Sequence, residues 1–330
     1  MKKYLNSIFG IGNPLIDISY FTSDKTILDL ELKKGTMALV DARRQIEILK
    51  YLKKLKPKYA PGGSAPNTIL SSSGLGIKSH ISGRIGNDYF SDKYIERVKS
   101  YKVDSGLVKQ KGLTGSSIVL VTPDGERTMN THLGACRDYC PLDIDVEKLA
   151  KSEFLYFTGY MWDTESQKSS IHEAITVAKE NDVRVVFDIA DPLVVTRNKM
   201  DFIELIDKQV DIIFANEEES KILTGSENIE DSINVLMSLT ATGAVKLGGD
   251  GSIIFHKNKK HKIKPNNVLV KDTTGAGDMY AAGFLSSISK GYSPFLAASN
   301  ASILAEEIIK IHGAQFEKLD IKVLKEKIFN

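Results

Sequence analysis

Residues 271–285, Lys-Asp-Thr-Thr-Gly-Ala-Gly-Asp-Met-Tyr-Ala-Ala-Gly-Phe-Leu, decide the fold class and the function of this chain. The apolar residues 268–270 predict a short strand that leads into this stretch. Gly275 and Gly277 let the backbone turn sharply, and they leave no Cβ between the backbone and a ligand. The small and apolar residues 279–289 then predict a buried helix. Such a turn directs free N–H groups and the positive end of the helix dipole at one point, which predicts an anion hole suited to phosphate oxygens.

Asp278 directly follows these glycines and has two interpretations. A carboxylate in the first turn of a helix is common because it interacts favourably with the helix dipole. At the mouth of a phosphate site it can instead accept the proton of an attacking hydroxyl, while the amides hold the charge on the transferred group. The glycine spacing is neither Gly-x-x-x-x-Gly-Lys nor Gly-x-Gly-x-x-Gly, so the stretch indicates neither a P-loop nor a dinucleotide fingerprint.

Length and composition are those of a globular protein. The 330 residues, 42% of them hydrophobic, suffice for one large α/β domain or two smaller ones. No apolar run approaches the ~20 residues of a membrane helix, and we expect no signal peptide. The net charge of +2 is too small to indicate a nucleic-acid partner. Two cysteines, Cys136 and Cys140, are too few for a disulfide framework or a zinc site, and they predict a cytoplasmic protein with free thiols.

Strands and helices alternate from residue 154 onward. Apolar runs at 154–159, 183–189 and 211–216 predict strands, and helix-like stretches at 167–179 and 202–208 separate them. This alternation predicts a parallel sheet with helices on both faces. Two non-contiguous segments, about 13–41 and 106–134, contain short strand-like runs and turns instead, and they predict a second, smaller sheet.

Two N-terminal features indicate a ligand site. Residues 12–14 break the first strand, which places Asp17 at or just beyond the strand end, where open α/β sheets bind ligands. Asp17 lies between two isoleucines, where an unpartnered carboxylate is destabilising, so a ligand role is favoured over a turn residue. Gly62 and Gly63 again allow close backbone approach before a helix, and Asn67 offers a donor and an acceptor one turn later. Adjacent glycines alone indicate little, because many loops contain them.

Asp272-Thr-Thr-Gly-Ala-Gly-Asp278 resembles the C-terminal signature of the PfkB, or ribokinase-like, carbohydrate and purine kinases. Residues 60–68, together with Ser82-Gly-Arg-Ile-Gly-Asn-Asp88, are similar to the N-terminal signature of that family. The resemblance covers essentially the whole chain. It implies a single domain over residues 1–330, built as a three-layer α/β/α sandwich with a mostly parallel central sheet. It also implies that the smaller sheet is a lid, which excludes water during phosphoryl transfer.

The resemblance implies a role for each matching position. Asp278 matches the catalytic base, and the amides of Gly275, Ala276 and Gly277 match the anion hole. The substrate site matches Asn13, Asp17, Gly62, Gly63, Ser64 and Asn67. The ATP site matches Asn216, Lys246, Gly248, Gly251, Thr273, Thr274, Asn300, His312 and Gly313. Glu219 matches the acidic residue that positions Mg²⁺ through water.

Some of these assignments leave alternatives open. Asn216 and Glu219 begin a helix, where a capping role competes with the metal role. Position 246 is often Thr in the family, and Lys246 can instead reach a phosphate. ATP and Mg²⁺ are the expected cofactors. A requirement for a monovalent cation such as K⁺, and the choice between monomer and homodimer, are left open.

Three stretches, 13–19, 126–135 and 157–163, resemble the adenosine-kinase branch more than ribokinases or fructokinases. A nucleoside kinase must hold an apolar base, although apolar residues at matching positions are more often core residues. The candidates for the wall of this pocket are Leu15, Met37, Met129, Leu133 and Met161. Our interpretation is ATP-dependent phosphorylation of the 5′-hydroxyl of adenosine. The alternatives are a kinase of ribose, fructose or a related sugar, an inosine or guanosine kinase, and a non-catalytic nucleoside-binding protein.

Overall fold

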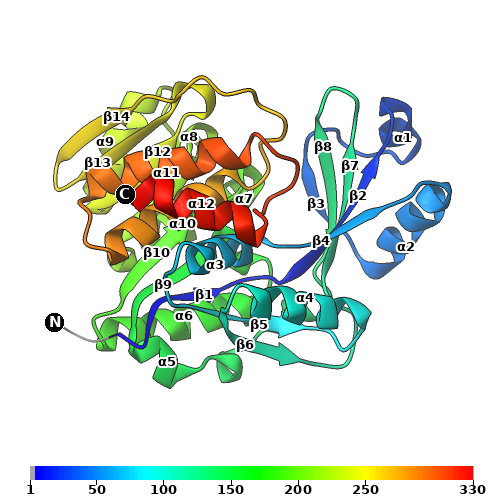
Figure 1. Cartoon of the computed structure of the whole chain (residues 1–330), viewed down its shortest axis with the longest axis horizontal. Helices are drawn as coiled ribbons and strands as arrows, with labels where there is room; N and C mark the ends of the chain where they lie inside the picture. The colour runs from blue at the N-terminus through cyan, green and yellow to red at the C-terminus, as the bar shows by residue number, and fades with distance from the viewer. Residues whose placement is uncertain (1–3, 330) are drawn as a thin grey trace.

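The larger sheet is built from the near-continuous apolar segments. In this computed structural model, which describes residues 4–329, nine strands follow the order β14-β13-β12-β11-β10-β9-β1-β5-β6 (Figure 1). All neighbours from β12 to β6 pair in parallel, whereas β13 and β14 form an antiparallel hairpin at one edge. The bounds are β1 Asn6–Ile11, β5 Ser79–Ile85, β6 Asp104–Lys109, β9 Ser152–Thr158, β10 Arg184–Asp188, β11 Ile212–Asn216, β12 Thr242–Lys246, β13 Ser252–His256 and β14 Lys259–Ile263.

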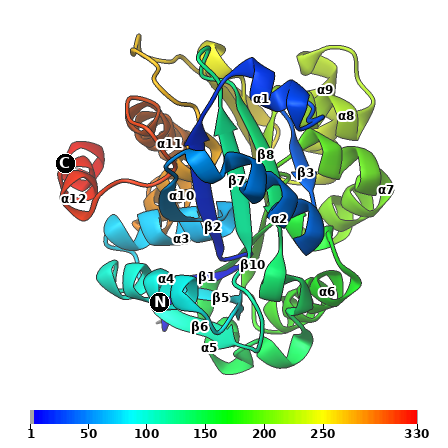
Figure 2. The ribbon, with the colours of Figure 1, turned by 90° about the vertical axis from the view of Figure 1, so that its right-hand side faces the viewer.

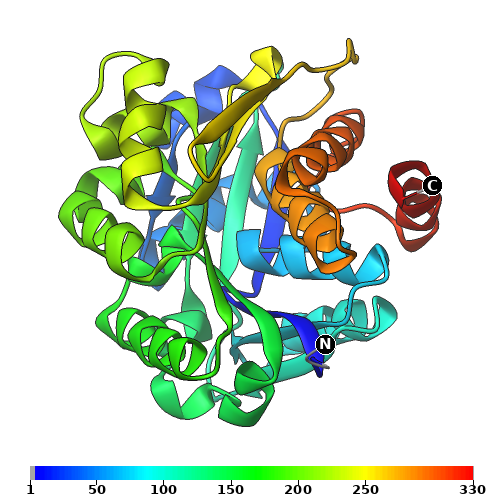
Figure 3. The same cartoon turned by 90° about the vertical axis from the view of Figure 1, so that its left-hand side faces the viewer.

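Helices cover both faces of this sheet, as the βα alternation predicts (Figure 3). One apolar core lies under α3 (Ser64–Gly74), α4 (Tyr89–Ser100), α10 (Ala276–Ser289), α11 (Pro294–Ile308) and α12 (Lys318–Phe329). A second core lies under α5 (Val146–Ala150), α6 (Glu165–Glu180), α7 (Pro192–Gln209), α8 (Glu217–Thr224) and α9 (Ile229–Leu239). Within residues 4–329, no helix has the length and apolar character that crossing a membrane requires.

The smaller sheet follows the order β3-β8-β7-β2-β4. Its strands are β2 Leu15–Phe21, β3 Met37–Leu39, β4 Lys58–Gly62, β7 Ser116–Val121 and β8 Arg127–His132. Helices α1 (Asp24–Asp29) and α2 (Ala42–Tyr51) cover its outer face (Figure 2). Burial alternates along β2, where Ile16 and Ile18 are buried under these helices. Because successive side chains of a strand point to opposite faces, Asp17 lies on the inner face, which is turned toward the rest of the molecule (Figure 1).

The structure corrects two local predictions. Asp17 is not at the end of β1 but within β2, because a second strand with period-two burial begins directly after the break at residues 12–14. The predicted strand at 268–270 is absent from the region between β14 and α10. Leu269 and Val270 are largely exposed there, and the backbone of Lys271 donates to Ile309 rather than to a neighbouring strand.

The segments assigned to the smaller sheet also differ from the prediction at two places. Residues 106–109 belong to β6, which follows α4 and pairs in parallel with β5 in the larger sheet. The prediction omitted β4, which forms the edge of the smaller sheet and pairs antiparallel with β2. The smaller sheet therefore takes its strands from three parts of the chain rather than two.

Candidate active site

The turn before α10 has the geometry that its glycines predict. Gly275 is the N-cap residue, with φ 77° and ψ 1° in the left-handed region. A Cβ on Gly275 would lie 2.8 Å from the Cα of Ala314, so only glycine fits this close approach. The N–H of Ala276 donates to the carbonyl of Thr273 at 3.2 Å and is therefore already engaged. The predicted anion hole thus depends on the amides of Gly275 and Gly277 and on the dipole of α10.

Asp278 belongs to the first turn of α10, and its carboxylate faces the first turn of α3. Its Oδ1 accepts a hydrogen bond from Ser64 Oγ at 2.6 Å, and its Oδ2 accepts one from Asn67 Nδ2 at 2.8 Å. Burial raises the pKa of Asp278 to about 6, although these two donated hydrogen bonds oppose the rise. The predicted base is thus held by two donors. Ser64 and Asn67, predicted as substrate contacts, hold the base in this structure.

Lys246, at the end of β12, is a buried cation beside this turn. Its Nζ lies 3.3 Å from both carboxylate oxygens of Asp188 on β10, and 18% of its side chain is exposed. A Cβ on Gly277 would lie 3.2 Å from the same Nζ. Burial alone would lower the pKa of Lys246, but the carboxylates of Asp188 and Glu219 outweigh it and the pKa is raised. The charged form of Lys246 is therefore favoured, and this cation lies next to the N-terminus of α10.

Glu219 serves as a helix cap in this structure. Its carboxylate accepts hydrogen bonds from the backbone N–H of Asn216 at 2.8 Å and from Asn216 Nδ2 at 2.7 Å. Asn216 Oδ1 accepts one from the N–H of Glu219 in return, which completes a capping box on α8. Burial raises the pKa of Glu219 to about 7, with Lys246 opposing the rise. The structure therefore shows the capping role; the metal role stays a prediction.

Asp17 and the double glycine lie side by side. A Cβ on Gly62 would come within 2.5 Å of Asp17 Oδ2, and a Cβ on Gly63, where φ is 99°, would overlap the carbonyl oxygen of Asn13. Burial raises the pKa of Asp17 to about 6, and the positive charge of Arg127 opposes this rise. The predicted substrate residues Asp17, Gly62 and Gly63 are thus brought together, and Gly63 leads directly into α3, which carries Ser64 and Asn67.

Asp272 joins two of the loops predicted to bind the nucleotide. One carboxylate oxygen accepts hydrogen bonds from the N–H and the hydroxyl of Thr274 at 3.0 and 2.7 Å. The other accepts from the N–H of Gly313 at 2.8 Å. Thr273 and His312 are exposed beside this junction. Gly248 and Gly251 lie in the turn between β12 and β13.

Three of the predicted contact residues have buried side chains in this structure, and their contacts to a ligand stay predictions. Met161 is 0% exposed and packs in the core under α6 and α7, in the short 3₁₀ segment Gly159–Trp162 that follows β9. Asn300 is 6% exposed and donates to Ser287 Oγ, so it joins α11 to α10. Asn13 is buried and accepts a hydrogen bond from Gln167 at 2.6 Å. Of the other apolar candidates, Met37 and Met129 are paired across β3 and β8, and Leu15 and Leu133 are partly exposed.

Residues 47–321 match the model of the pfkB family carbohydrate kinases. The chain belongs to the PfkB family. This PfkB protein is 27% identical over 343 residues to the adenosine kinase of Dictyostelium discoideum, across 96% of its own length and 98% of the relative's. It is 30% identical to the crystal structure of adenosine kinase from Sinorhizobium meliloti, with a TM-score of 0.91, across 98% and 99% of the two chains. It is 28% identical to a probable sugar kinase from Rhizobium etli CFN 42, with a TM-score of 0.92, across 100% of both chains.

These matches confirm the ribokinase-like α/β fold and the adenosine-kinase-like resemblance. The protein is a kinase, a phosphotransferase with a hydroxyl group as its acceptor. An adenosine kinase and a probable sugar kinase match at similar identity, so membership of the family does not by itself identify the molecule that is phosphorylated.

Sequence reasoning missed two residues that lie beside the predicted site residues. Arg127 comes from β8 of the smaller sheet, and its Nη2 lies 3.6 Å from Asp272 Oδ2. Its positive charge also favours the ionised form of Asp17. Its position within the stretch 126–135 was a usable signal. Gln315 contacts Asn67 from the loop after α11 and carries no sequence signal, because a lone glutamine in a loop is ordinary.

Proposed function

We propose that this PfkB kinase transfers the γ-phosphoryl group of ATP to the 5′-hydroxyl of adenosine. The observation that carries the proposal is the position of Asp278, a carboxylate held by two donors on the first turn of α10. The similarity to adenosine kinases along nearly the whole chain supports a nucleoside acceptor. The paired Met37 and Met129 supply an apolar surface for a base on strands of the smaller sheet.

The residues of the site divide the work of an in-line transfer. Asp278 takes the proton of the acceptor hydroxyl. At the same time the hydroxyl oxygen forms the new bond to the γ-phosphorus, and the bond between the γ-phosphorus and the oxygen of the β-phosphate breaks. The N-terminus of α10 and Lys246 stabilise the negative charge on the transferred group. Asp17 and the backbone at Gly63 orient the ribose. We further propose that the smaller sheet closes over the acceptor and excludes water, so that ATP is not hydrolysed.

The residues fit Mg²⁺ carried by ATP rather than held by the protein alone. Within residues 4–329, no group of three or more His, Cys, Asp or Glu side chains is arranged to hold a metal ion. Mg²⁺ commonly keeps several waters and binds substrate phosphates with few carboxylates. Glu219 is the residue that we propose for such a contact through water; it is only 2% exposed and both of its oxygens accept from Asn216, so the contact would use the remaining lone pair of one oxygen. When bound, Mg²⁺ would add positive charge against the phosphates.

A panel of acceptors tests the proposed function. ADP release is measured with adenosine, inosine, guanosine, ribose and fructose, with Mg²⁺ and with or without K⁺. We expect the highest kcat/KM for adenosine. Activity with ribose and none with nucleosides would favour a sugar kinase, an alternative that the similarity to the probable sugar kinase from Rhizobium etli supports. Adenosine binding without ADP release under any cation condition would identify a non-catalytic binding protein.

The two free thiols favour action in the cytosol, a reducing compartment.

We expect kcat/KM for the acceptor, at saturating ATP, to fall as the pH drops below about 6. Only the ionised form of Asp278 can accept a proton, and burial raises its pKa to about 6. Activity is therefore present above this pH and is lost as the pH falls through it. The measurement is a profile from pH 5 to pH 9. An acid limb near pH 4, the ordinary range of a carboxyl group, would contradict the assignment.

A further inference from the structure

Three side chains connect Asp278 to the surface of the molecule. Asn67 Nδ2 donates to Asp278 Oδ2 at 2.8 Å, and Asn67 Oδ1 accepts from Gln315 Nε2 at 2.8 Å. Gln315 Nε2 also donates to the carbonyl of Pro61 at 2.9 Å. Gln315 Oε1 accepts from Arg97 Nε at 3.0 Å. This series of hydrogen bonds runs from α4 through the loop after α11 to α3 and α10.

The groups at the two ends of this series of hydrogen bonds decide the direction of each of them. The guanidinium of Arg97 can only donate, so it must face the oxygen of Gln315. The carbonyl of Pro61 can only accept, so it must face the nitrogen of the same amide. The nitrogen of Gln315 in turn must face the oxygen of Asn67. Asn67 is left with its NH₂ group toward Asp278, which as a carboxylate is an acceptor only.

We propose that Gln315 is a positioning residue, which fixes the orientation of the Asn67 amide so that Asn67 donates to Asp278. The inference depends on the proposed role of Asp278 as the base. With Gln315 in place, the ionised form of Asp278 has two donors, Ser64 and Asn67. With the Asn67 amide reversed, an amide oxygen would face the carboxylate, and only a protonated Asp278 could donate to it.

The other charged and titratable groups that act on Asp278 come from the larger sheet. They are Asp188 on β10 and Lys246 on β12, together with Tyr156 on β9 and Tyr160 just after it. Substitution of Gln315 leaves all four in place. A change in the titration of Asp278 in an uncharged Gln315 variant therefore reports on the path through Asn67, whereas a carboxylate at position 315 also repels the ionised Asp278 directly.

The test compares three glutamine variants. Gln315→Glu keeps the shape of the side chain and its bond to Arg97, but its carboxylate repels the oxygen of Asn67 and reverses that amide. We expect its acid limb in kcat/KM to move up by about one pH unit, because hydrogen bonds to charged groups are worth roughly that much. Near pH 9 we expect its activity to come within about twofold of the wild type, because Asp278 is then ionised again. Gln315→Met, which removes both polar groups, should move the limb in the same direction by less.

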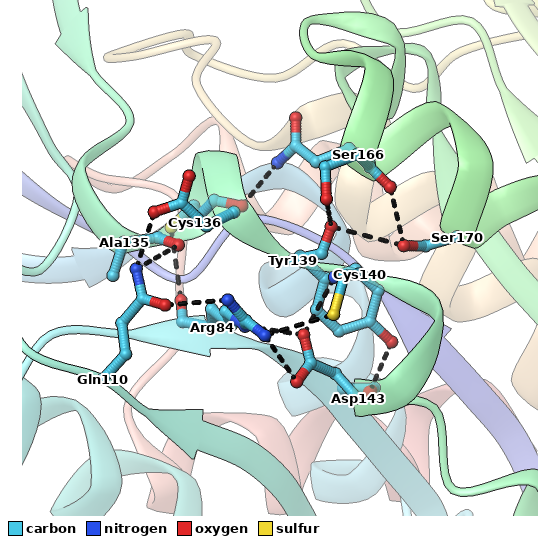
Figure 4. A network of polar contacts seen from close by, with 12 residues as sticks. Arg84, Gln110, Ala135, Cys136, Tyr139, Cys140, Asp143, Ser166 and Ser170 are labelled. Carbon is cyan, nitrogen blue, oxygen red and sulfur yellow. Dashed lines mark hydrogen bonds and ion pairs between the residues drawn. The ribbon is translucent and has the colours of Figure 1, made fainter.

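Gln110→Glu is the matched control. Gln110 accepts from Arg84 at 2.8 Å and donates to Asp138 at 2.8 Å, so it too is an amide between an arginine and an acceptor (Figure 4). It is not part of the chain of bonds to Asp278. We expect its acid limb to match the wild type. A purely structural role of Gln315 would instead lower activity equally at all pH values.

A second measurement is independent of catalysis. The carboxyl carbon of Asp278 is titrated by ¹³C NMR in the full-length protein, with its signal assigned from the Asp278→Asn spectrum. An upward shift in both Gln315→Glu and the uncharged Gln315→Met supports the inference, whereas a shift in Gln315→Glu alone reports only the added negative charge and contradicts it. Limbs and titrations equal to the wild type in both Gln315 variants overturn it. An inactive wild-type protein whose Asp278 titration still shifts in the variant would refute the proposed function while supporting the role of Gln315.

Discussion

We expect the Asp278→Asn variant to lose about 10²–10⁴-fold in kcat, the usual contribution of a general base. Asparagine has the size of aspartate and can still accept a hydrogen bond from Ser64 or Asn67, so the contact between α3 and α10 is retained. It cannot take up the proton of the attacking hydroxyl. The measurement is ADP release at saturating ATP and acceptor, together with the melting temperature.

Asp143→Asn is a suitable control for this substitution. The Asp143 side chain is 6% exposed and bonds to Arg84 at 2.6 Å and to the N–H of Cys140 at 2.9 Å, in a separate polar network (Figure 4). We expect it to lose stability but to keep its turnover below its unfolding temperature. If Asp278→Asn turned over near the wild-type rate, Asp278 would be a helix-capping residue and not the base.

Lys246→Met should lower both stability and turnover. Removing the cation leaves the buried carboxylate of Asp188 without its partner, and breaking such a pair costs about 3 kcal/mol in the free energy of unfolding. It also removes a positive charge beside Gly277, where the loss of one stabilising group commonly lowers kcat by about 10²–10³-fold. Urea unfolding and ADP release measure the two effects separately.

A double variant separates the two roles of Lys246. In Lys246→Met with Asp188→Asn the carboxylate of Asp188 is removed together with its partner, and only Glu219 still loses the charge of Lys246, so we expect part of the lost stability to return while kcat stays low. The single variant Asp188→Asn provides the remaining corner of the cycle. Recovery of both stability and turnover in the double variant would show that Lys246 serves only to neutralise Asp188.

Local features of the chain were sufficient for most of the architecture. The βα alternation after residue 154 and the glycine turn before α10 each depend on neighbours within a few positions, and both are present in the structure. The errors arose where a distant segment decided the outcome. Residues 268–270 have strand-like composition but no strand beside them, and residues 106–109 pair with β5 instead of the smaller sheet.

The sequence by itself determined the family and the identity of the candidate base, because the segment 272–278 is contiguous and its turn chemistry is local. Only the tertiary structure decided the partners of that base. Asn67 and Asp278 are 211 positions apart and meet because α3 packs against α10. Packing likewise set Lys246 against Asp188 and Gln315 against Asn67, and it buried Met161 in the core under α6 and α7. Such contacts depend on which elements share a face, which no local pattern in the chain records.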